Sequence, residues 1–148
     1  MRQSKYFKSD ERGATLVEFS IAATVFLVSM FAVIEFGRAL YVHNALSDAA
    51  RRGARYAVLH SAADIDKVKN VVVYGDEDGG DQPLIPNLTT ENVTVTYSDF
   101  LLNHGTASVS ITDYEFQFVV PVVGTTITMP NYKTTLSGES VGLIPADM

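Results

Sequence analysis

The fold of this chain is decided by one stretch, Gly13-Ala14-Thr15-Leu16-Val17-Glu18-Phe19, which opens an apolar run that continues to Ile34. A helix over 14–34 would be about 31 Å long at roughly 1.5 Å per residue, which matches the hydrocarbon core of a bilayer. The only charged residue in that run is Glu18. A charged side chain in hydrocarbon costs roughly 2.5–3.5 kcal/mol even on lenient scales. The sequence therefore predicts a membrane helix whose single carboxylate needs a partner.

Cleavage of the chain would create the nearest partner for Glu18. A cut between Gly13 and Ala14 would free the ammonium group of Ala14, one helical turn away from Glu18. We therefore interpret residues 1–13 as a leader that is removed. Two alternatives stay open, a cleaved secretory signal and an uncut single-pass anchor. The first fits poorly, because the apolar run exceeds a typical h-region and has no small-x-small site with a polar exit.

The distribution of charge predicts how the chain lies in the membrane. The formal net charge is −6, yet the leader is basic, with Arg2, Lys5, Lys8 and Arg12 against Asp10 and Glu11. An excess of Lys and Arg before the apolar run places the N-terminus in the cytoplasm, and the rest of the chain in the periplasm or outside the cell. The acidic remainder argues against a nucleic-acid partner. The chain contains no cysteine, which excludes disulfides and thiolate metal sites.

Beyond Ile34 the helix pattern continues and becomes amphipathic. No proline interrupts the chain between Ala14 and Leu59, so we expect one helix of about 45 residues with a kink possible at Gly37. Its segments would be 14–34 in the membrane and 35–60 as an extension. A stripe of small residues on the extension would pack against the chain's own sheet, or alternatively against a neighbouring subunit: Ala45, Ala49, Ala50, Gly53, Ala54 and Ala57.

Residues 61–148 are predicted to form a β-rich head. Val68 to Tyr74 is β-branched and is interpreted as a strand, or as a helix end running into one. Further strands are expected over 92–97, within 107–120, over 126–129 and over 132–136, with a turn at 103–105. The expected fold class is α+β: a long N-terminal helix packed on a small antiparallel meander of three or four strands.

The helix carries a set of motifs that resembles a known family. These are the stretch from Gly13 to Phe19, then Glu35-Phe36-Gly37-Arg38, Asn44-Ala45, and Asp48-Ala49-Ala50-Arg51-Arg52-Gly53-Ala54-Arg55-Tyr56-Ala57. Over roughly residues 10 to 58 the chain is similar to TadE-like pseudopilins of the tight-adherence (Flp-type) branch of the type IV pilus systems. The resemblance implies a membrane protein that takes part in pilus assembly.

The resemblance also implies roles for single residues. A prepilin peptidase would cut between Gly13 and Ala14, because a larger side chain at Gly13 would obstruct it. Glu18, followed by Phe19, would neutralise the N-terminal amine of a neighbouring subunit or of its own chain and so set the register of assembly. The remaining family-like positions lie on the helix surface, and for the part from Asp48 to Arg55 a solvated, ion-paired face is the alternative: Glu35, Gly37, Arg38, Asp48, Arg51, Gly53 and Arg55.

Other candidate chemistry is weak. Asp76, Asp78 and Asp81 could collect calcium, but they lack the spacing and the closing glutamate of an EF-hand loop, so a solvated acidic turn is the favoured interpretation. The three histidines, at positions 43, 60 and 104, have no ligand spacing to one another. No nucleophile elbow or phosphate loop occurs. We therefore expect neither an enzyme nor a cofactor.

Together these observations predict a pseudopilin (minor pilin) that acts in assembly of Flp/Tad-type pili. Its partners would be a prepilin peptidase, other pilins, the inner-membrane assembly platform and membrane lipid, with no nucleic acid. It would be a single-pass protein of the bacterial inner membrane with a periplasmic head, and entry into the extracellular pilus stays open. The alternatives are an uncleaved membrane-anchored binding module and a pilus-tip adhesin.

Overall fold

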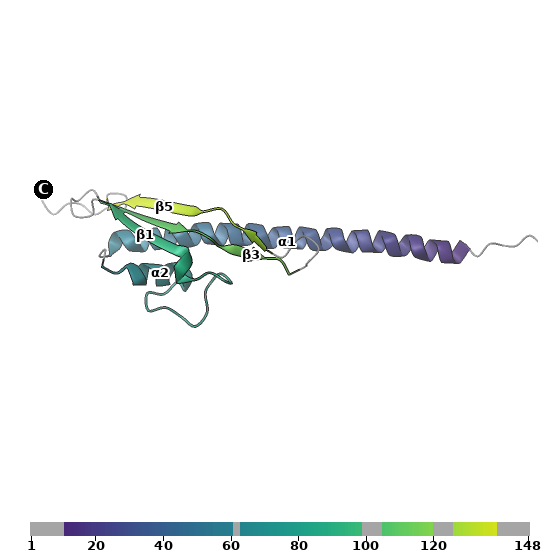
Figure 1. Cartoon of the computed structure of the whole chain (residues 1–148), viewed down its shortest axis with the longest axis horizontal. Coiled ribbons are helices and arrows are strands. Elements are labelled where there is room, and N and C mark those ends of the chain that lie inside the picture. Colours follow the sequence, from purple (N-terminus) through teal and green to yellow (C-terminus); the bar gives the residue numbers. More distant parts are fainter. Residues whose placement is uncertain (1–10, 61–62, 99–104, 120–125, 139–148) are drawn as a thin grey trace, which may run out of the picture.

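A single long helix organises the molecule. The computed structural model describes residues 11–60, 63–98, 105–119 and 126–138. The first helix, α1, runs from Glu11 to Leu59 over 49 residues, which is roughly 74 Å at 1.5 Å per residue. It continues without interruption through Gly37, where a kink had been a possibility. Its N-terminal half projects away from the rest of the chain, and the head packs along its other half (Figure 1).

A second helix follows α1 directly. Helix α2 spans Ile65–Val73, so the interpretation of Val68 to Tyr74 as a strand is wrong. The valines at 68, 71 and 72 are buried at helical spacing, and the helix packs against α1. Their burial on one helix face outweighs the local preference of β-branched residues for strands. The helix ends at Val73 and is followed by its C-cap residue Tyr74, whose N–H donates to Asn70 O over 2.7 Å, and then by Gly75 with φ of 82°.

The head contains five strands among the described residues, one more than the largest number expected. A 3₁₀ turn, η1 (Thr90–Asn92), precedes the first of them. The strands are β1 (Val93–Ser98), β2 (Thr106–Ile111), β3 (Glu115–Gln117), β4 (Thr126–Thr128) and β5 (Tyr132–Ser137). Three of them form an antiparallel sheet in the order β1-β2-β5, and β3 pairs with β4. Asn103 and His104 of the predicted turn, and residues 1–10 of the predicted leader, lie outside the described residues.

The two pairs β2–β5 and β3–β4 form one long ribbon. Ile111 pairs with Tyr132, and Glu115 pairs with Thr128, so the register is the same on both sides of the break. The break lies where Asp113 adopts a positive φ of 56°. Burial changes phase there, from odd-numbered residues in β2 to Tyr114 and Phe116 beyond it. The backbone therefore twists at Asp113 so that the opposite set of alternating side chains is buried beyond it, and both parts of the ribbon keep one buried face.

The core lies between one face of the sheet and the two helices. Helix α1 packs under β2 and β5, and α2 contacts α1 and β1. The small-residue stripe of α1 contributes to this core, and its packing on the chain's own sheet is the arrangement expected. The predicted α+β fold, a helix on a small antiparallel head, is confirmed. The buried sheet residues that meet the helices include Val93, Ala107, Val109, Ile111 and Tyr132.

Candidate functional site

The N-terminal half of α1 is an exposed apolar surface. In the described part of the chain one helix, within Gly13–Leu59, is long and apolar enough to cross a membrane, and none of its most apolar window is buried against the head. Phe19 is 70% exposed and Phe26 is 66% exposed. A soluble protein rarely leaves so large a continuous apolar surface in water. The arrangement is compatible with anchoring in a membrane.

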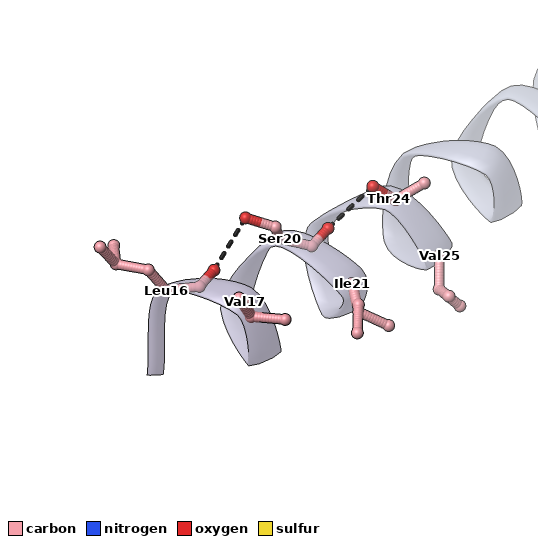
Figure 2. A pocket seen from close by; sticks show the side chains of 6 residues that line it. All are labelled: Leu16, Val17, Ser20, Ile21, Thr24 and Val25. Carbon is pink, nitrogen blue, oxygen red and sulfur yellow. Dashed lines mark hydrogen bonds between the residues drawn. The ribbon is translucent and has the colours of Figure 1, made fainter. Parts of the chain in front are cut away.

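Three hydroxyl side chains inside this surface donate hydrogen bonds to backbone carbonyls of their own helix. The hydroxyl of Ser20 donates to Leu16 O over 2.7 Å, and that of Thr24 donates to Ser20 O over 2.8 Å (Figure 2). Ser29 does the same with Val25 O over 2.8 Å. A hydroxyl that bonds back to the preceding turn does not carry an unpaired donor into hydrocarbon. These three residues therefore fit a helix surrounded by lipid or by other apolar helices.

The residues predicted to control processing and register lie on this free half. Gly13 and Ala14 are in the first turns of α1 and are exposed, and a Cβ added at Gly13 would meet nothing within 4 Å. Glu18 and Phe19 are also exposed. Among the described residues no cation lies within ion-pair distance of Glu18. The described part of the head thus offers Glu18 no ion-pair partner, and the role of Glu18 in register stays a prediction.

Glu35 is the first residue of α1 that the head covers. It is 3% exposed, although the helix on its N-terminal side is open. Its carboxylate accepts from Arg38 Nη1 at 2.7 Å and from the backbone N–H of Val119 at 3.3 Å. The guanidinium of Arg38 also lies 5.2 Å from the centre of the Phe116 ring. Two of the family-like positions, Glu35 and Arg38, therefore hold the end of β3 against the helix.

The remaining family-like positions divide into exposed and buried ones. Asp48 and Arg51 form an ion pair of 3.5 Å that is well exposed, and Arg55 is exposed as well. Gly37 is exposed, and a Cβ added there would meet nothing within 4 Å. This part of the helix resembles the solvated, ion-paired face that was the alternative interpretation. Gly53, in contrast, is buried.

Gly53 lies where three elements meet. It is buried in α1, and a Cβ added to it would collide with Val72 Cγ2 of α2 and would lie 3.3 Å from Val109 Cγ1 of β2. The absence of a side chain thus allows α2 and β2 to approach α1 together. Gly53 was predicted both within the helix-surface block and within the small-residue stripe that packs on the sheet, and its burial agrees with the stripe.

Arg52 was not singled out by the sequence, yet it connects the two helices. Its Nε donates to Val71 O over 3.1 Å and its Nη2 donates to Val72 O over 3.2 Å. Both are carbonyls of the last turn of α2, and that of Val71 also accepts from the backbone N–H of Gly75 over 3.1 Å. No local signal identifies this role, because it depends on residues 65–73 being a helix.

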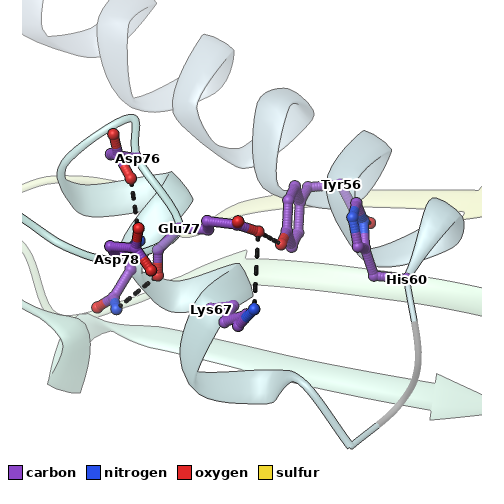
Figure 3. Close-up of polar contacts among 7 residues, drawn as sticks. Tyr56, His60, Lys67, Asp76, Glu77 and Asp78 are labelled. Carbon is purple, nitrogen blue, oxygen red and sulfur yellow. Dashed lines mark hydrogen bonds and ion pairs between the residues drawn. The ribbon is translucent and has the colours of Figure 1, made fainter.

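A polar network at the distal end of α1 was also missed. The Tyr56 hydroxyl donates to Glu77 Oε2, Lys67 Nζ lies 3.9 Å from the same oxygen, and the His60 ring stacks on Tyr56 at 3.8 Å (Figure 3). The hydrogen bond to Glu77, together with burial and the charge of that carboxylate, raises the pKa of Tyr56 to about 12. The network ties the loop after α2 to α1.

The acidic loop and the histidines have structural surroundings. Asp76 accepts from the N–H of Asp78 over 3.0 Å, and Asp81 is exposed. Within the described ranges no group of three His, Cys, Asp or Glu side chains is placed to hold a metal. His43 shares a hydrogen bond of 2.8 Å with the Tyr132 hydroxyl, and His60 bonds to Tyr56 O. His104 lies outside the described residues.

The comparisons with known proteins agree with this geometry. Residues 13–55 match a protein-family model described as TadE-like protein. The match begins at the predicted cleavage site and ends near the last turn of α1, so it covers the free half of the helix, Glu35 and Gly53. No curated protein and no solved structure matches the chain.

Proposed function

We propose, from the premise that this chain is a TadE-like protein of the Tad/Flp pilus system, that it is a minor pilin processed after Gly13. The observation that carries the proposal is the division of α1 into two halves. One half is bound to the head, and the other is an apolar rod that nothing in the described chain covers. A rod of that kind can be held in lipid and later packed against the helices of other pilins.

The position of Glu18 supports processing and assembly through this rod. The carboxylate lies within the first turns of the apolar half, where a charge without a partner costs several kcal/mol. Cleavage between Gly13 and Ala14 would supply an ammonium group one turn away, on this chain or on a neighbour. Pairing in an apolar bundle would then fix the axial register of the subunits, because breaking a buried pair costs on the order of 3–5 kcal/mol.

The head completes the proposal. We place it in the periplasm, with the N-terminus of the chain in the cytoplasm and a single crossing over 14–34. Its described interior is packed with apolar side chains, and we assign it a structural, non-enzymatic role. Its partners would be the prepilin peptidase, sibling pilins and the assembly platform of the inner membrane.

The test is complementation of cells that lack the native copy, with intact mass and piliation as the two measurements. The wild-type chain should begin at Ala14, and Glu18→Ala should be processed normally yet fail to support pili. Ser29→Ala is the matched control, because it also removes a polar group from the free half but one that bonds only to its own helix. Retention of Met1 to Gly13 in the wild-type protein would favour the anchored binding module. Normal piliation with Glu18→Ala would contradict the role in register.

A further inference from the structure

The end of the head that faces the free half of α1 includes the described part of the β3–β4 hairpin, residues 115–119 and 126–128, and only this part is meant by the hairpin below. Figure 1 shows β3 at this end, beside the point where the helix leaves the head. The contact is specific, because the backbone N–H of Val119 donates to Glu35 Oε1 over 3.3 Å. Glu35 in turn is paired with Arg38 at 2.7 Å. Val119 is therefore fixed at the axial level of Glu35.

That level coincides with the edge of the apolar run. The uncharged segment of α1 ends at Ile34, and a bilayer adds polar zones of roughly 5–7 Å on each side of its core of about 30 Å. At roughly 1.5 Å per residue, those zones cover about four residues of helix beyond Ile34. The hairpin contact at Glu35 thus lies in the headgroup zone when residues 14–34 fill the hydrocarbon core.

The hairpin has the chemistry that this zone accepts. Glu115, four residues before Val119, is exposed, but no charged residue lies between it and Lys133, in a chain whose net charge is −6. Val119 is 72% exposed and Ile127, on β4, is 44% exposed. Among the described residues, the acidic side chain fixed at this level is Glu35, which is covered and paired with Arg38. Apolar and uncharged groups gain free energy at the boundary of lipid and water, whereas the acidic surface of the rest of the head would be repelled by anionic lipids.

We propose that the β3–β4 hairpin, through Val119, rests on the lipid surface beside α1 and is a second membrane contact of the protein. The partner is the bilayer, and the inference depends on residues 14–34 spanning it, as in the proposed function. The hairpin would hold the head down on the membrane until the helix leaves the lipid. A second copy of the chain packed on Val119 is the competing occupant.

The chain contains no tryptophan and no cysteine, so a single introduced residue is a unique reporter. The experiment uses the full chain in vesicles of phosphatidylcholine and phosphatidylglycerol, at high lipid excess, with and without brominated phosphatidylcholine. Val119→Trp is the test variant. Leu59→Trp is the matched control, because Leu59 is 56% exposed at the far end of α1, and Phe26→Trp reports the membrane helix itself.

We expect brominated lipid to quench Val119→Trp clearly, less than Phe26→Trp and more than Leu59→Trp, with a blue shift of its emission on vesicle binding. Quenching of Phe26→Trp alone would overturn the hairpin contact and leave the proposed function intact. Absence of quenching in Phe26→Trp would overturn both. A nitroxide on Val119→Cys provides the second measurement, and greater accessibility to a water-soluble relaxation agent than to oxygen would also contradict lipid contact.

Discussion

At the scale of single residues, Gly53 determines how closely the elements of the head approach one another. It is the point where α1, α2 and β2 meet, and even one added carbon would collide with Val72. Gly37, in the same helix, has open space around it. A side chain therefore has no room at Gly53 and ample room at Gly37, although both are family-like positions in the sequence.

Gly53→Ala should destabilise the head. Overpacking of a filled core costs about 1–3 kcal/mol, and the better helix propensity of alanine offsets about 1 kcal/mol of it. Gly37→Ala is the control and should stabilise α1 by about 0.5–1 kcal/mol. Thermal unfolding of both variants in detergent, followed by near-UV circular dichroism, measures the difference. Equal midpoints for the two variants would mean that Gly53 is not under close contact.

At the scale of the elements, α1 and the strands could be predicted from the sequence, and α2 could not. The absence of helix breakers between Ala14 and Leu59 and the alternation in β1 and β2 are local patterns that survive in the structure. The valines of α2 favour a strand locally and become helical because their buried face meets α1. The contact between Glu35 and Val119 joins residues 84 positions apart, and no local pattern contains it.

The connection between α1 and the loop after α2 should depend on pH. The raised pKa of Tyr56, about 12, means that the folded state holds the phenolic proton more tightly than the unfolded chain does, whose tyrosines titrate near 10. The stability that this proton contributes is complete below pH 10 and is lost as the pH rises from 10 to 12. Tyr56→Phe should therefore show a shallower loss of stability across that interval.

Alkaline titrations of phenolate absorbance and of denaturant stability measure this effect. The wild-type protein should contain a late-titrating tyrosine that Tyr56→Phe lacks. The other tyrosines with raised pKa values, Tyr97, Tyr114 and Tyr132, are present in both proteins and cancel in the comparison. Identical titration curves would contradict the hydrogen bond between Tyr56 and Glu77.

At the scale of the whole molecule, Glu35 joins the head to the C-terminal end of the apolar rod. Glu35→Ala would leave the Val119 N–H and Arg38 without this partner, which should cost about 1–3 kcal/mol. Asp48→Ala removes a carboxylate from an exposed pair with the same spacing and should cost about 0–1 kcal/mol. Hydrogen exchange of the Val119 amide should rise in the first variant and stay unchanged in the second.

The continuity of α1 through Gly37 has a mechanical consequence. An unkinked helix transmits any tilt of its N-terminal half to the half that carries the head. Helices that span a membrane, as proposed for residues 14–34, tilt by about 20° on average to match bilayer thickness. Over roughly 74 Å of helix, such a tilt moves the far end of the head sideways by about 25 Å. In the proposed membrane orientation, the thickness of the bilayer would thereby set the orientation of the head.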